Sequence, residues 1–576
     1  MAFVRGSRQG TGVGVVALLS GCLGATGLSA QTPLTAGAAY DSVQRLRRSA
    51  EHLWEHGDRT AFDSLRAALD FLARPDVRAL AQGWPYLNAR SSNVWYDLAR
   101  YHTQAGDTAA ALTALEQVAR TGGSASFLDI LARDSVLLPL TRLSRFQNVT
   151  RALGVERRMW DDSAFVSPYT ADLSLDQRLA GLAQLWAEVR WAYPDFKSAP
   201  DLDWDSLFIA YLPRVRAVEG TYAYYQVLQE FIATLRDAHS NVYFPSEVYA
   251  TWGIPPIRTG LVEDRVVVLD VMSPSVAALG VEVGQEVVAI DGVPVTEYAA
   301  ERITPYQSSS TPQDLAVRTY TYALLWGQED EPIRLTLRSA DGTRRDVSVL
   351  RSGYADRERR PLVRDSVLQG NVGYLRVDDF QRDSIVRLVG EALRRLQGTR
   401  GLVIDVRHND GGSSNIGYAL LAMLAHEPFP TSAAWVRSYN AYYRVRGFGF
   451  LVSVLPPRDV RPDTSVRYNG PVVVLAGPET FSAAEDFLVA YRQMERGPII
   501  GEPSGGNTGQ PLFFRLPGGG SARVRTKHDH FADGREFLGI GIPPHIAVRP
   551  TLAGVRAGRD EVLEAALRYL AGADRP

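Results

Sequence analysis

Hydrophobic positions along this 576-residue chain change period several times, and each change predicts a boundary between structural units. Residues 38–155 and 172–250 carry apolar side chains at helical spacing, as in "SLDQRLAGLAQLWAEVRWAYPDF". Residues 256–351 instead contain short β-branched runs, and "IRLTLRSADGTRRDVSVLR" holds an Asp-Gly hairpin turn. Residues 365–552 alternate strands with helices, and residues 553–576 form a C-terminal helix. The pattern predicts a multidomain α/β protein with two helical regions, a β-rich domain and an α/β core.

The predicted core contains strands that are apolar on both faces. The runs "GNVGYLRVDDF", "GLVIDVR", "PVVVLAG" and "PIIGEP" alternate with helical segments, which is the pattern of a sheet covered by helices on both sides. Residues 448–470, between two of these units, read as an inserted loop.

The first helical region contains "NVWYDLARYHTQAGDTAAALTALEQVARTG", with apolar or small residues at helical spacing on both sides of a turn at Gly106. This segment resembles one tetratricopeptide unit, and a plain helical bundle fits the same pattern equally well. The region shows no chemistry of its own, and a protein partner of these helices stays open as its role.

The β-rich region contains "SPSVAALGVEVGQEVVAIDGVPV", which resembles the helix, turn and strand of a PDZ domain. Gly284-Gln285 stands where that family usually has Gly-Asp. PDZ domains bind extended peptide ends by adding them to a sheet as a strand. The resemblance therefore implies a peptide-binding role for residues 256–351.

The N-terminus predicts an export signal over residues 1–30. Arg5 and Arg8 precede the apolar run "GVGVVALLSG", which is too short for a permanent membrane span. Cleavage after Ala30 competes with a lipobox-like sequence that ends at Cys22, the one Cys of the chain, so no intramolecular disulfide can form. We expect an exported, soluble protein of the periplasm or cell envelope, with or without a lipid anchor at Cys22.

The amino-acid composition limits which partners and which catalytic residues the chain can have. The apolar share of 45% and the charged share of 22% are ordinary for globular proteins, and the net charge of −2 offers no basic field for nucleic acid. Lys197 and Lys527 are the two lysines of the chain, which limits where a lysine could act as a base.

The first candidate for chemistry is Ser482, in "PETFSAAEDF". It follows a buried strand and opens a helix, and with Glu485 three residues later it fits a capping box. The unpaired N–H groups and the dipole of a helix N-terminus also stabilise an oxyanion, so a cap and a nucleophile suit the same place. No G-x-S-x-G elbow is present, which argues against an ordinary α/β hydrolase.

A nucleophilic serine needs a base. His239 stands beside Asp237 where a helical pattern gives way to a strand. The stretch "IDVRHNDGGSSN" ends a buried strand and presents Gly411 and Gly412, whose backbone can approach an anion closely, although no phosphate-loop pattern is present.

His528 and His530 share one face of a predicted strand. The pair could suit a metal, but no third ligand is evident, and exposed strand positions are the better interpretation. We expect neither a metal nor a cofactor.

Four motifs in order carry a family resemblance. The stretches "DAHS", "DVRHNDGG", "TFSAAE" and "GEPSGGNTGQP" surround the PDZ-like region. In this order they resemble the tail-specific or C-terminal processing serine proteases, in the tricorn-like and retinoid-binding-protein-like branch. The resemblance covers residues 172–552 and implies an α/β tail-specific-protease catalytic core.

The resemblance implies a role for each matching residue. Ser482 matches the nucleophile and His239 the base of the histidine-using branch, and Glu485 matches a structural glutamate. The positions that match the family's backbone oxyanion donors are Gly411, Gly412 and Ala483.

The remaining positions depart from the family. Asn507, or its neighbour Thr508, stands where the lysine-dyad branch has its base, so that dyad is absent. The third triad acid is open, because "GIGIPPHI" has His545 in place of an Asp and Leu538 at the expected acidic position. Glu536 is the nearest upstream acid, and Asp237 is the other candidate to orient the base.

The function that follows is an exported serine endopeptidase that hydrolyses protein or peptide substrates through Ser482 and His239, with PDZ-assisted binding. A second hypothesis is a catalytically inactive ligand-binding or scaffold protein on the same fold, because fold alone does not fix function.

Overall fold

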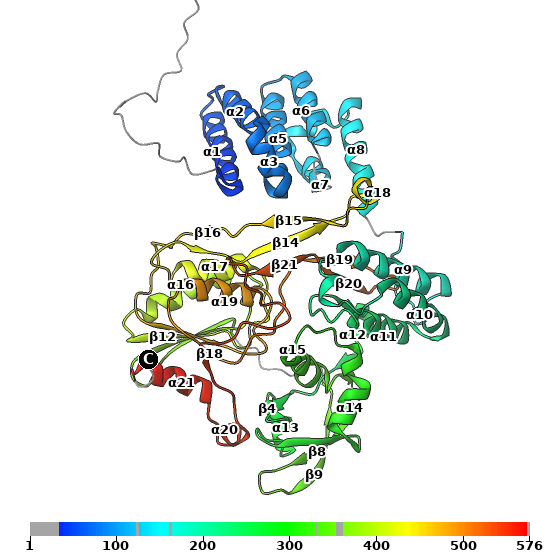
Figure 1. Cartoon of the computed structure of the whole chain (residues 1–576), viewed down its shortest axis with the longest axis vertical. Helices are drawn as coiled ribbons and strands as arrows, with labels where there is room; N and C mark the ends of the chain where they lie inside the picture. The colour runs from blue at the N-terminus through cyan, green and yellow to red at the C-terminus, as the bar shows by residue number, and fades with distance from the viewer. Residues whose placement is uncertain (1–33, 122–125, 161–163, 330, 353–360, 573–576) are drawn as a thin grey trace, which may run out of the picture.

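The computed structural model describes residues 34–572, apart from residues 122–125, 161–163, 330 and 353–360. Figure 1 shows a helical region at the top, an α/β core beside a second helical segment in the middle, and a β-rich domain below. The export signal predicted for residues 1–30, with Cys22 and Ala30, lies outside the described residues. Within the described ranges no helix is both long and apolar enough to cross a membrane.

The N-terminal region is helical, as predicted. Helices α5 and α6 pack against each other across a turn at Gly106, whose φ of 81° suits glycine. Leu98 and Leu115 are buried between the helices of the region. The elements are α1 (Ala36–Glu55), α2 (Ala61–Ala73), α3 (Pro75–Gly83), α4 (Pro85–Asn88), α5 (Arg90–Gln104), α6 (Thr108–Arg120), α7 (Ser126–Arg133), the 3₁₀ turn η1 (Ser135–Leu140) and α8 (Ser144–Trp160).

The second helical segment shares a sheet with a much later part of the chain. Its strand β1 pairs antiparallel with β20, so that Val242 lies opposite Ala522. Phe231 of α11 and Val524 of β20 belong to one buried hydrophobic cluster, so the two stretches pack against each other. The elements are α9 (Leu175–Ala192), η2 (Phe196–Ser198), α10 (Trp204–Ala217), α11 (Thr221–Ala233), β1 (Asn241–Tyr243), α12 (Ser246–Tyr249), β19 (Pro511–Arg515) and β20 (Ser521–Arg525).

The β-rich domain is built on an antiparallel sheet in the order β3-β4-β5-β8-β9, with β6 paired to β5. The predicted Asp-Gly turn, with Gly342 at φ 89°, joins β8 to β9. The elements are β2 (Trp252–Gly253), β3 (Ile257–Val262), β4 (Arg265–Val271), α13 (Pro274–Ala278), β5 (Glu286–Ile290), β6 (Val293–Pro294), α14 (Val295–Arg302), η3 (Thr304–Tyr306), α15 (Pro312–Ala316), the π-helix η4 (Val317–Ala323), β7 (Gly327–Gln328), β8 (Pro332–Arg338) and β9 (Arg344–Leu350).

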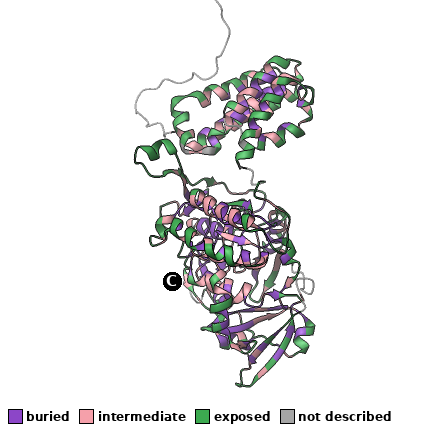
Figure 2. Cartoon of the chain, turned by 90° about the vertical axis from the view of Figure 1, so that its right-hand side faces the viewer, coloured by how far each residue is buried: buried purple, intermediate pink, exposed green. Residues whose placement is uncertain are grey.

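The α/β core has a six-stranded sheet in the order β10-β11-β12-β17-β18-β22, parallel except for the pair β10 and β11. Successive residues of β17 enter two different buried clusters: Val474 faces α16, α17 and α19, and Val473 faces α21. Figure 2 shows this buried interior in purple. The elements are β10 (Val363–Leu368), β11 (Val372–Val377), α16 (Ser384–Leu396), β12 (Gly401–Asp405), α17 (Ser414–Ala422), β17 (Val472–Ala476), α19 (Ala483–Gln493), β18 (Ile499–Gly501), β22 (Ile546–Ala547), α20 (Leu552–Arg556) and α21 (Glu561–Leu570).

The prediction of an inserted loop over residues 448–470 was wrong in part. A second sheet in the order β15-β14-β21 and the short pair β13 and β16 include strands from this stretch. Apolar side chains in "LVSVL" sustain a strand that pairs with β14. The elements are β13 (Phe429–Pro430), β14 (Ala433–Ser438), α18 (Ala441–Val445), β15 (Leu451–Leu455), β16 (Asp459–Val460) and β21 (Lys527–His530).

Candidate active site

Ser482 occupies a strained turn between β17 and α19. Its φ of 57° and ψ of −124° lie in a region that costs a non-glycine residue about 1–3 kcal/mol. Ser482 is the N-cap residue of α19, and Glu485 accepts its backbone N–H at 3.2 Å, as in the predicted capping box. The Oγ of Ser482 lies 2.9 Å from Nε2 of His239. The strained turn therefore places the hydroxyl within hydrogen-bonding distance of an imidazole.

His239 reaches Ser482 because of the pairing between β1 and β20. It lies in the turn between α11 and β1, at the helix-to-strand boundary that the sequence predicts, and only 2% of its surface is exposed. Its ring stacks on Phe481, with centroids 4.7 Å apart and planes 12° apart. The fold thus joins two residues that are 243 positions apart in the sequence.

The other ring nitrogen of His239 is held by an amide. Nδ1 lies 2.6 Å from Oδ1 of Asn507. Because an amide oxygen only accepts, Nδ1 carries the proton and donates it, which leaves the lone pair of Nε2 facing the Ser482 hydroxyl. This is the tautomer that a general base for Ser482 requires.

A buried polar network fixes Asn507 in turn. The Asn507 amide nitrogen donates to Oδ2 of Asp237, 3.3 Å away, and to Oγ of Ser310. Nε of Arg525 donates to the same Asp237 oxygen at 2.5 Å. Although burial disfavours the charge, Arg525 holds the pKa of Asp237 below its usual value. Asp237 also accepts the backbone N–H of His239 at 3.0 Å, so it holds His239 both through the backbone and through Asn507.

The electrostatic setting keeps the imidazole neutral. Burial, with a smaller effect from the positive charge of Arg523, lowers the pKa of His239 to about 3. The neutral ring is the form that can accept a proton from a serine.

Two of the three predicted oxyanion donors are free. The Gly411 N–H donates to Oδ1 of Asn409 at 3.0 Å, so it is already used. In the part of the chain that the structure describes, the N–H groups of Gly412 and Ala483 have no hydrogen-bond partner. A Cβ on Gly411 would lie 3.0 Å from the Ala483 nitrogen, so the two loops meet beside Ser482. The free N–H groups lie where an oxyanion could be held.

Glu485 is fully buried and organises the loop that carries Asn507. Its carboxylate accepts the N–H of Ser482 at 3.2 Å, of Gly506 at 2.7 Å and of Asn507 at 2.9 Å, and the hydroxyl of Ser504 at 2.6 Å. Burial raises the pKa of Glu485 to about 7 against the opposing effect of these donors. One side chain thus ties the helix start to the Asn507 loop.

Glu536 lies apart from the base that it was predicted to orient. Its carboxylate is half-exposed and lies 2.7 Å from Nε2 of His528. Leu538, at the expected acidic position, packs against the hydrophobic core. The position at His239 that Glu536 was proposed to fill is occupied by Asn507.

The other candidate groups have local partners. Nζ of Lys527 lies 2.6 Å from Asp529, which also accepts the hydroxyl of Thr508 at 2.8 Å. Nδ1 of His545 accepts the N–H of Ile499 at 2.9 Å. The expectation of exposed strand positions was wrong for His528, which is buried between Asp195 and Glu536. The described residues contain no cluster of three or more His, Cys, Asp or Glu side chains placed to hold a metal.

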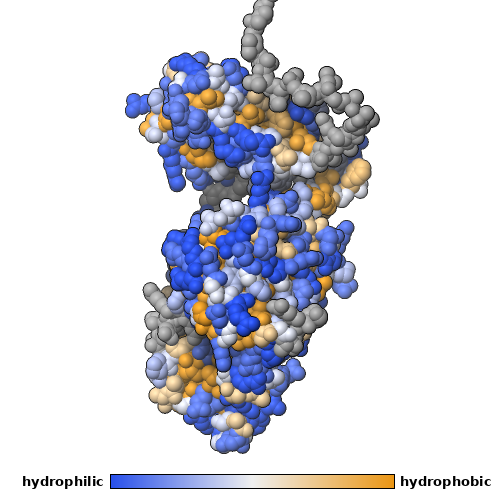
Figure 3. All heavy atoms as spheres, turned by 90° about the vertical axis from the view of Figure 1, so that its left-hand side faces the viewer, coloured by the Kyte–Doolittle hydropathy of each residue, from blue (hydrophilic) through white to orange (hydrophobic). Residues whose placement is uncertain are grey.

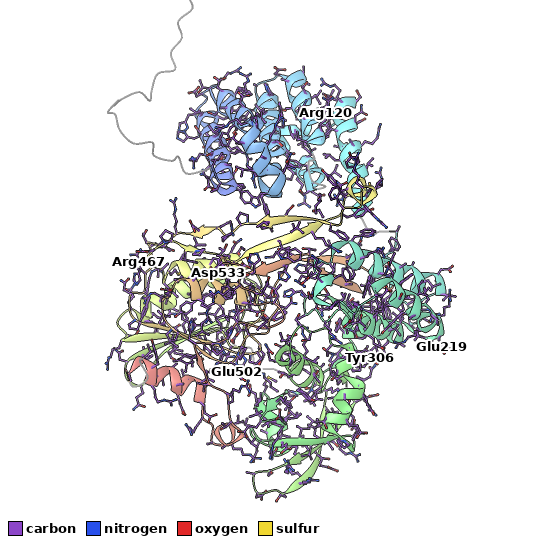
Figure 4. All side chains as sticks on the ribbon, viewed as in Figure 1. Arg120, Glu219, Tyr306, Arg467, Glu502 and Asp533 are labelled. Carbon is purple, nitrogen blue, oxygen red and sulfur yellow. The ribbon has the colours of Figure 1, made fainter. Side chains whose placement is uncertain are left out.

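A cavity of about 170 Å³ lies behind the turn that carries His239. Tyr306, labelled in Figure 4 where the helical segment meets the β-rich domain, helps to line it with Tyr243 and Arg318. Arg318 donates to the carbonyl of Ala238 at 3.2 Å. The β-rich domain therefore contributes side chains to this cavity and contacts the residue that precedes His239.

Comparisons with known proteins agree with this architecture. Residues 371–548 match the model of peptidase family S41. The chain is 24% identical over 427 residues to a carboxyl-terminal-processing protease of Synechocystis sp., covering 70% of this chain and 89% of that protein. It is also 24% identical over 359 residues to a carboxyl-terminal-processing protease of Picosynechococcus sp., covering 60% and 76%.

A solved structure shares the fold. The crystal structure of mature CPAF superposes with a TM-score of 0.54 at 18% identity, covering 70% of this chain and 99% of that chain. Together, the matched family model and the two processing proteases identify residues 371–548 as a peptidase family S41 domain and the chain as a serine-type peptidase similar to the C-terminal processing proteases.

Proposed function

We propose that this peptidase cleaves protein or peptide substrates with Ser482 as the nucleophile and His239 as the general base. The observation that carries the proposal is the 2.9 Å approach of Nε2 of His239 to Oγ of Ser482. This distance allows direct proton transfer between the two groups.

The reaction follows from the geometry. His239 takes the hydroxyl proton of Ser482 as Oγ attacks the substrate carbonyl carbon, and the carbonyl π electrons become an oxyanion. The N–H groups of Gly412 and Ala483 donate to this oxyanion. The C–N bond then breaks, and His239 passes its proton to the leaving amine. Water repeats the sequence on the acyl-enzyme and frees the new carboxyl end and Ser482.

Asn507 acts in this scheme as a positioning residue. A neutral amide keeps the proton of His239 on Nδ1 but offers the imidazolium no opposite charge. The charge of Asp237 lies one hydrogen bond further away and is already paired with Arg525. Asn507 therefore orients the His239 ring more than it stabilises the positive charge of the imidazolium.

The β-rich region is proposed to be a PDZ-like domain that binds a substrate tail. Its antiparallel sheet with helices α13 and α14, and the side chains that it contributes beside His239, support this role. We further propose that residues 38–155 form a tetratricopeptide-like unit, and that residues 365–552 are the catalytic core.

We propose that the protein acts outside the cytoplasm, in the periplasm or cell envelope. The support is the signal-like sequence of residues 1–30, with Cys22 as the candidate lipid-anchor position. N-terminal sequencing and mass determination of the mature protein distinguish a lipidated Cys22 from an N-terminus at Gln31.

A serine-reactive fluorophosphonate probe tests the catalytic assignment. The wild-type protein should label and cleave an unstructured polypeptide, and both activities should disappear in Ser482→Ala. Ser413→Ala is the matched control, because Ser413 is also a helix N-cap residue. A wild-type protein that neither labels nor cleaves would favour the inactive ligand-binding or scaffold alternative.

A further inference from the structure

The hairpin between β14 and β15 ends in an exposed tip, residues 438–452. Every residue of this tip is solvent-exposed, including the short helix α18. Figure 1 places α18 at the end of the hairpin, beyond the body of the α/β core. The tip is thus a projection in which every residue is at least partly open to solvent.

The exposed side chains of the tip are mainly large and apolar. Val445 is 88% exposed, and Tyr442 and Phe448 are each 61% exposed. Others in the tip are Tyr439, Tyr443, Phe450, Leu451 and Val452. Single exposed apolar residues are normal, but a continuous group of this kind indicates an interaction surface. On the face drawn in Figure 3 hydrophilic residues predominate, with hydrophobic ones in separate patches.

The base of the tip is held in place. The ring of Tyr439 lies 4.4 Å from that of Trp191 in α9, centroid to centroid. The Arg437 guanidinium lies 3.7 Å from the ring centroid of Phe450 and donates to the carbonyl of Arg190 at 2.6 Å. These contacts hold the tip in a fixed direction relative to the helical segment.

The charge of this stretch has one sign. Between residues 428 and 458 the sequence contains Arg437, Arg444, Arg446 and Arg458 and no Asp or Glu, although the whole chain has a net charge of −2. Arg446 lies over the ring of Tyr442, 4.9 Å from its centroid. Arg444 donates to the hydroxyl of Tyr439 at 3.4 Å, and among the described residues neither Arg444 nor Arg446 forms an ion pair with a carboxylate. The tip therefore combines free positive charge with exposed aromatic and aliphatic groups.

We propose that the tip is a docking surface for an anionic lipid bilayer. Aromatic and aliphatic side chains mixed with arginine are the composition that enters the headgroup region, where rings lie at the boundary and guanidinium groups stay at the phosphates. A convex projection needs no matching hollow in a fluid lipid surface, whereas a protein partner would have to supply one. Docking would hold the active site close to membrane-associated substrates.

A fluorophore at the tip tests the proposal. In a Cys22→Ser background, Val445→Cys gives a single labelling position for an environment-sensitive NBD group, because Cys22 is the one native cysteine. Ile209→Cys, 61% exposed on α10, is the matched control. The full-length chain is mixed with vesicles of phosphatidylethanolamine and phosphatidylglycerol, and separately with phosphatidylcholine alone.

We expect a blue shift and roughly a doubling of emission at position 445 with the anionic vesicles only, and no change at position 209. Replacing both arginines, as Arg444→Gln with Arg446→Gln, should weaken the vesicle affinity reported at position 445 about thirtyfold. Each arginine near an anionic surface adds a comparable share of the binding free energy, so two losses multiply. The fluorophore reports only on contact between lipid and position 445. Membrane binding through a lipid anchor at the N-terminus would therefore not produce the same change in emission. Fluorophosphonate labelling of Ser482 reports that each variant is folded.

Three results would overturn the proposal. The first is unchanged emission at position 445 while the protein sediments with vesicles. The second is an equal change at positions 445 and 209. The third is a change at position 445 without lipid, either on raising the protein concentration or on adding unstructured polypeptide, which would assign the tip to a second copy or to a protein partner.

Discussion

Oδ1 of Asn507 lies 2.6 Å from Nδ1 of His239, across 268 positions of sequence. A neutral amide therefore stands where a serine peptidase triad commonly has a carboxylate. The nearest carboxylate, that of Asp237, is bound to the other end of the same amide and to Arg525. The site orients its base through a chain of buried hydrogen bonds that ends in an ion pair.

Replacing Asn507 should damage catalysis more than binding. In Asn507→Ala the ring of His239 loses the acceptor that fixes its tautomer and direction, so we expect kcat to fall about 10²-fold with KM little changed. Peptide hydrolysis under steady-state conditions measures both constants. Asn148→Ala, at an exposed position of α8, is the control and should behave as wild type. An unchanged kcat in Asn507→Ala would remove the positioning role.

The pH profile should extend to acid. Because burial lowers the pKa of His239 to about 3, the ring stays neutral far below the ordinary histidine value of about 6.5, and kcat/KM should remain near its plateau at about pH 5. The same low pKa has the opposite consequence for folding stability, which should decrease toward acid pH. Between these two values the unfolded state binds the extra proton, so stability falls as the pH decreases.

Initial rates measured from neutral to acid pH, with circular dichroism at each pH, separate the two effects. Loss of activity near pH 6.5 in a protein that is still folded would contradict the prediction.

Gly411 has no room for a side chain. A Cβ there would lie 2.7 Å from Cβ of Ser482 and 2.9 Å from the carbonyl oxygen of Phe481, at a φ of 103°. Gly411→Ala should displace the loop that carries the oxyanion donors, and we expect the rate of fluorophosphonate labelling to fall by about 10²-fold or more. Gly398→Ala, where a Cβ meets nothing within 4 Å, should label at the wild-type rate. Equal rates in the two variants would show that this loop does not take part.

Arg525 should be needed for folding as well as for the site. It and Asp237 form a buried ion pair, with side chains 4% and 1% exposed. Arg525→Met leaves the Asp237 charge buried without its partner, and we expect a loss of about 3–5 kcal/mol in the free energy of unfolding, measured in urea. Arg387→Met breaks the exposed pair with Glu391 and should change stability by less than about 1 kcal/mol. Similar losses in both variants would contradict this reading of the pair.

The sequence predicted most of the elements and their order, because hydrophobic periodicity and turn residues are local properties. It missed strands β15 and β16, and it gave one C-terminal helix where the structure has α20 and α21. It also placed Ser482 at a helix start and His239 at a helix-to-strand boundary, and the structure joins them. Local patterns gave no sign that β1 pairs with β20, which depends on packing between stretches far apart in the chain.

Asn507 shows the same limit at a single residue. From the sequence, Asn507 is only the position where a lysine is missing. An amide has no charge, and no sequence motif here indicates a role for it. Its hydrogen bond to His239 becomes visible only once the loop held by Glu485 is folded. Glu536 was chosen because it is acidic and near in sequence, whereas distance in space decides the partner of a base.

The pairing of β1 with β20 also sets when this enzyme can begin to work. Strand β20 ends at Arg525, so a growing chain contains the nucleophile well before it contains the strand that brings the base to it. A chain that is still being made thus carries Ser482 without His239 beside it. With Ser482 and His239 as the proposed catalytic pair, peptide hydrolysis has to wait until nearly the whole polypeptide has been synthesised, which protects the cell that makes it.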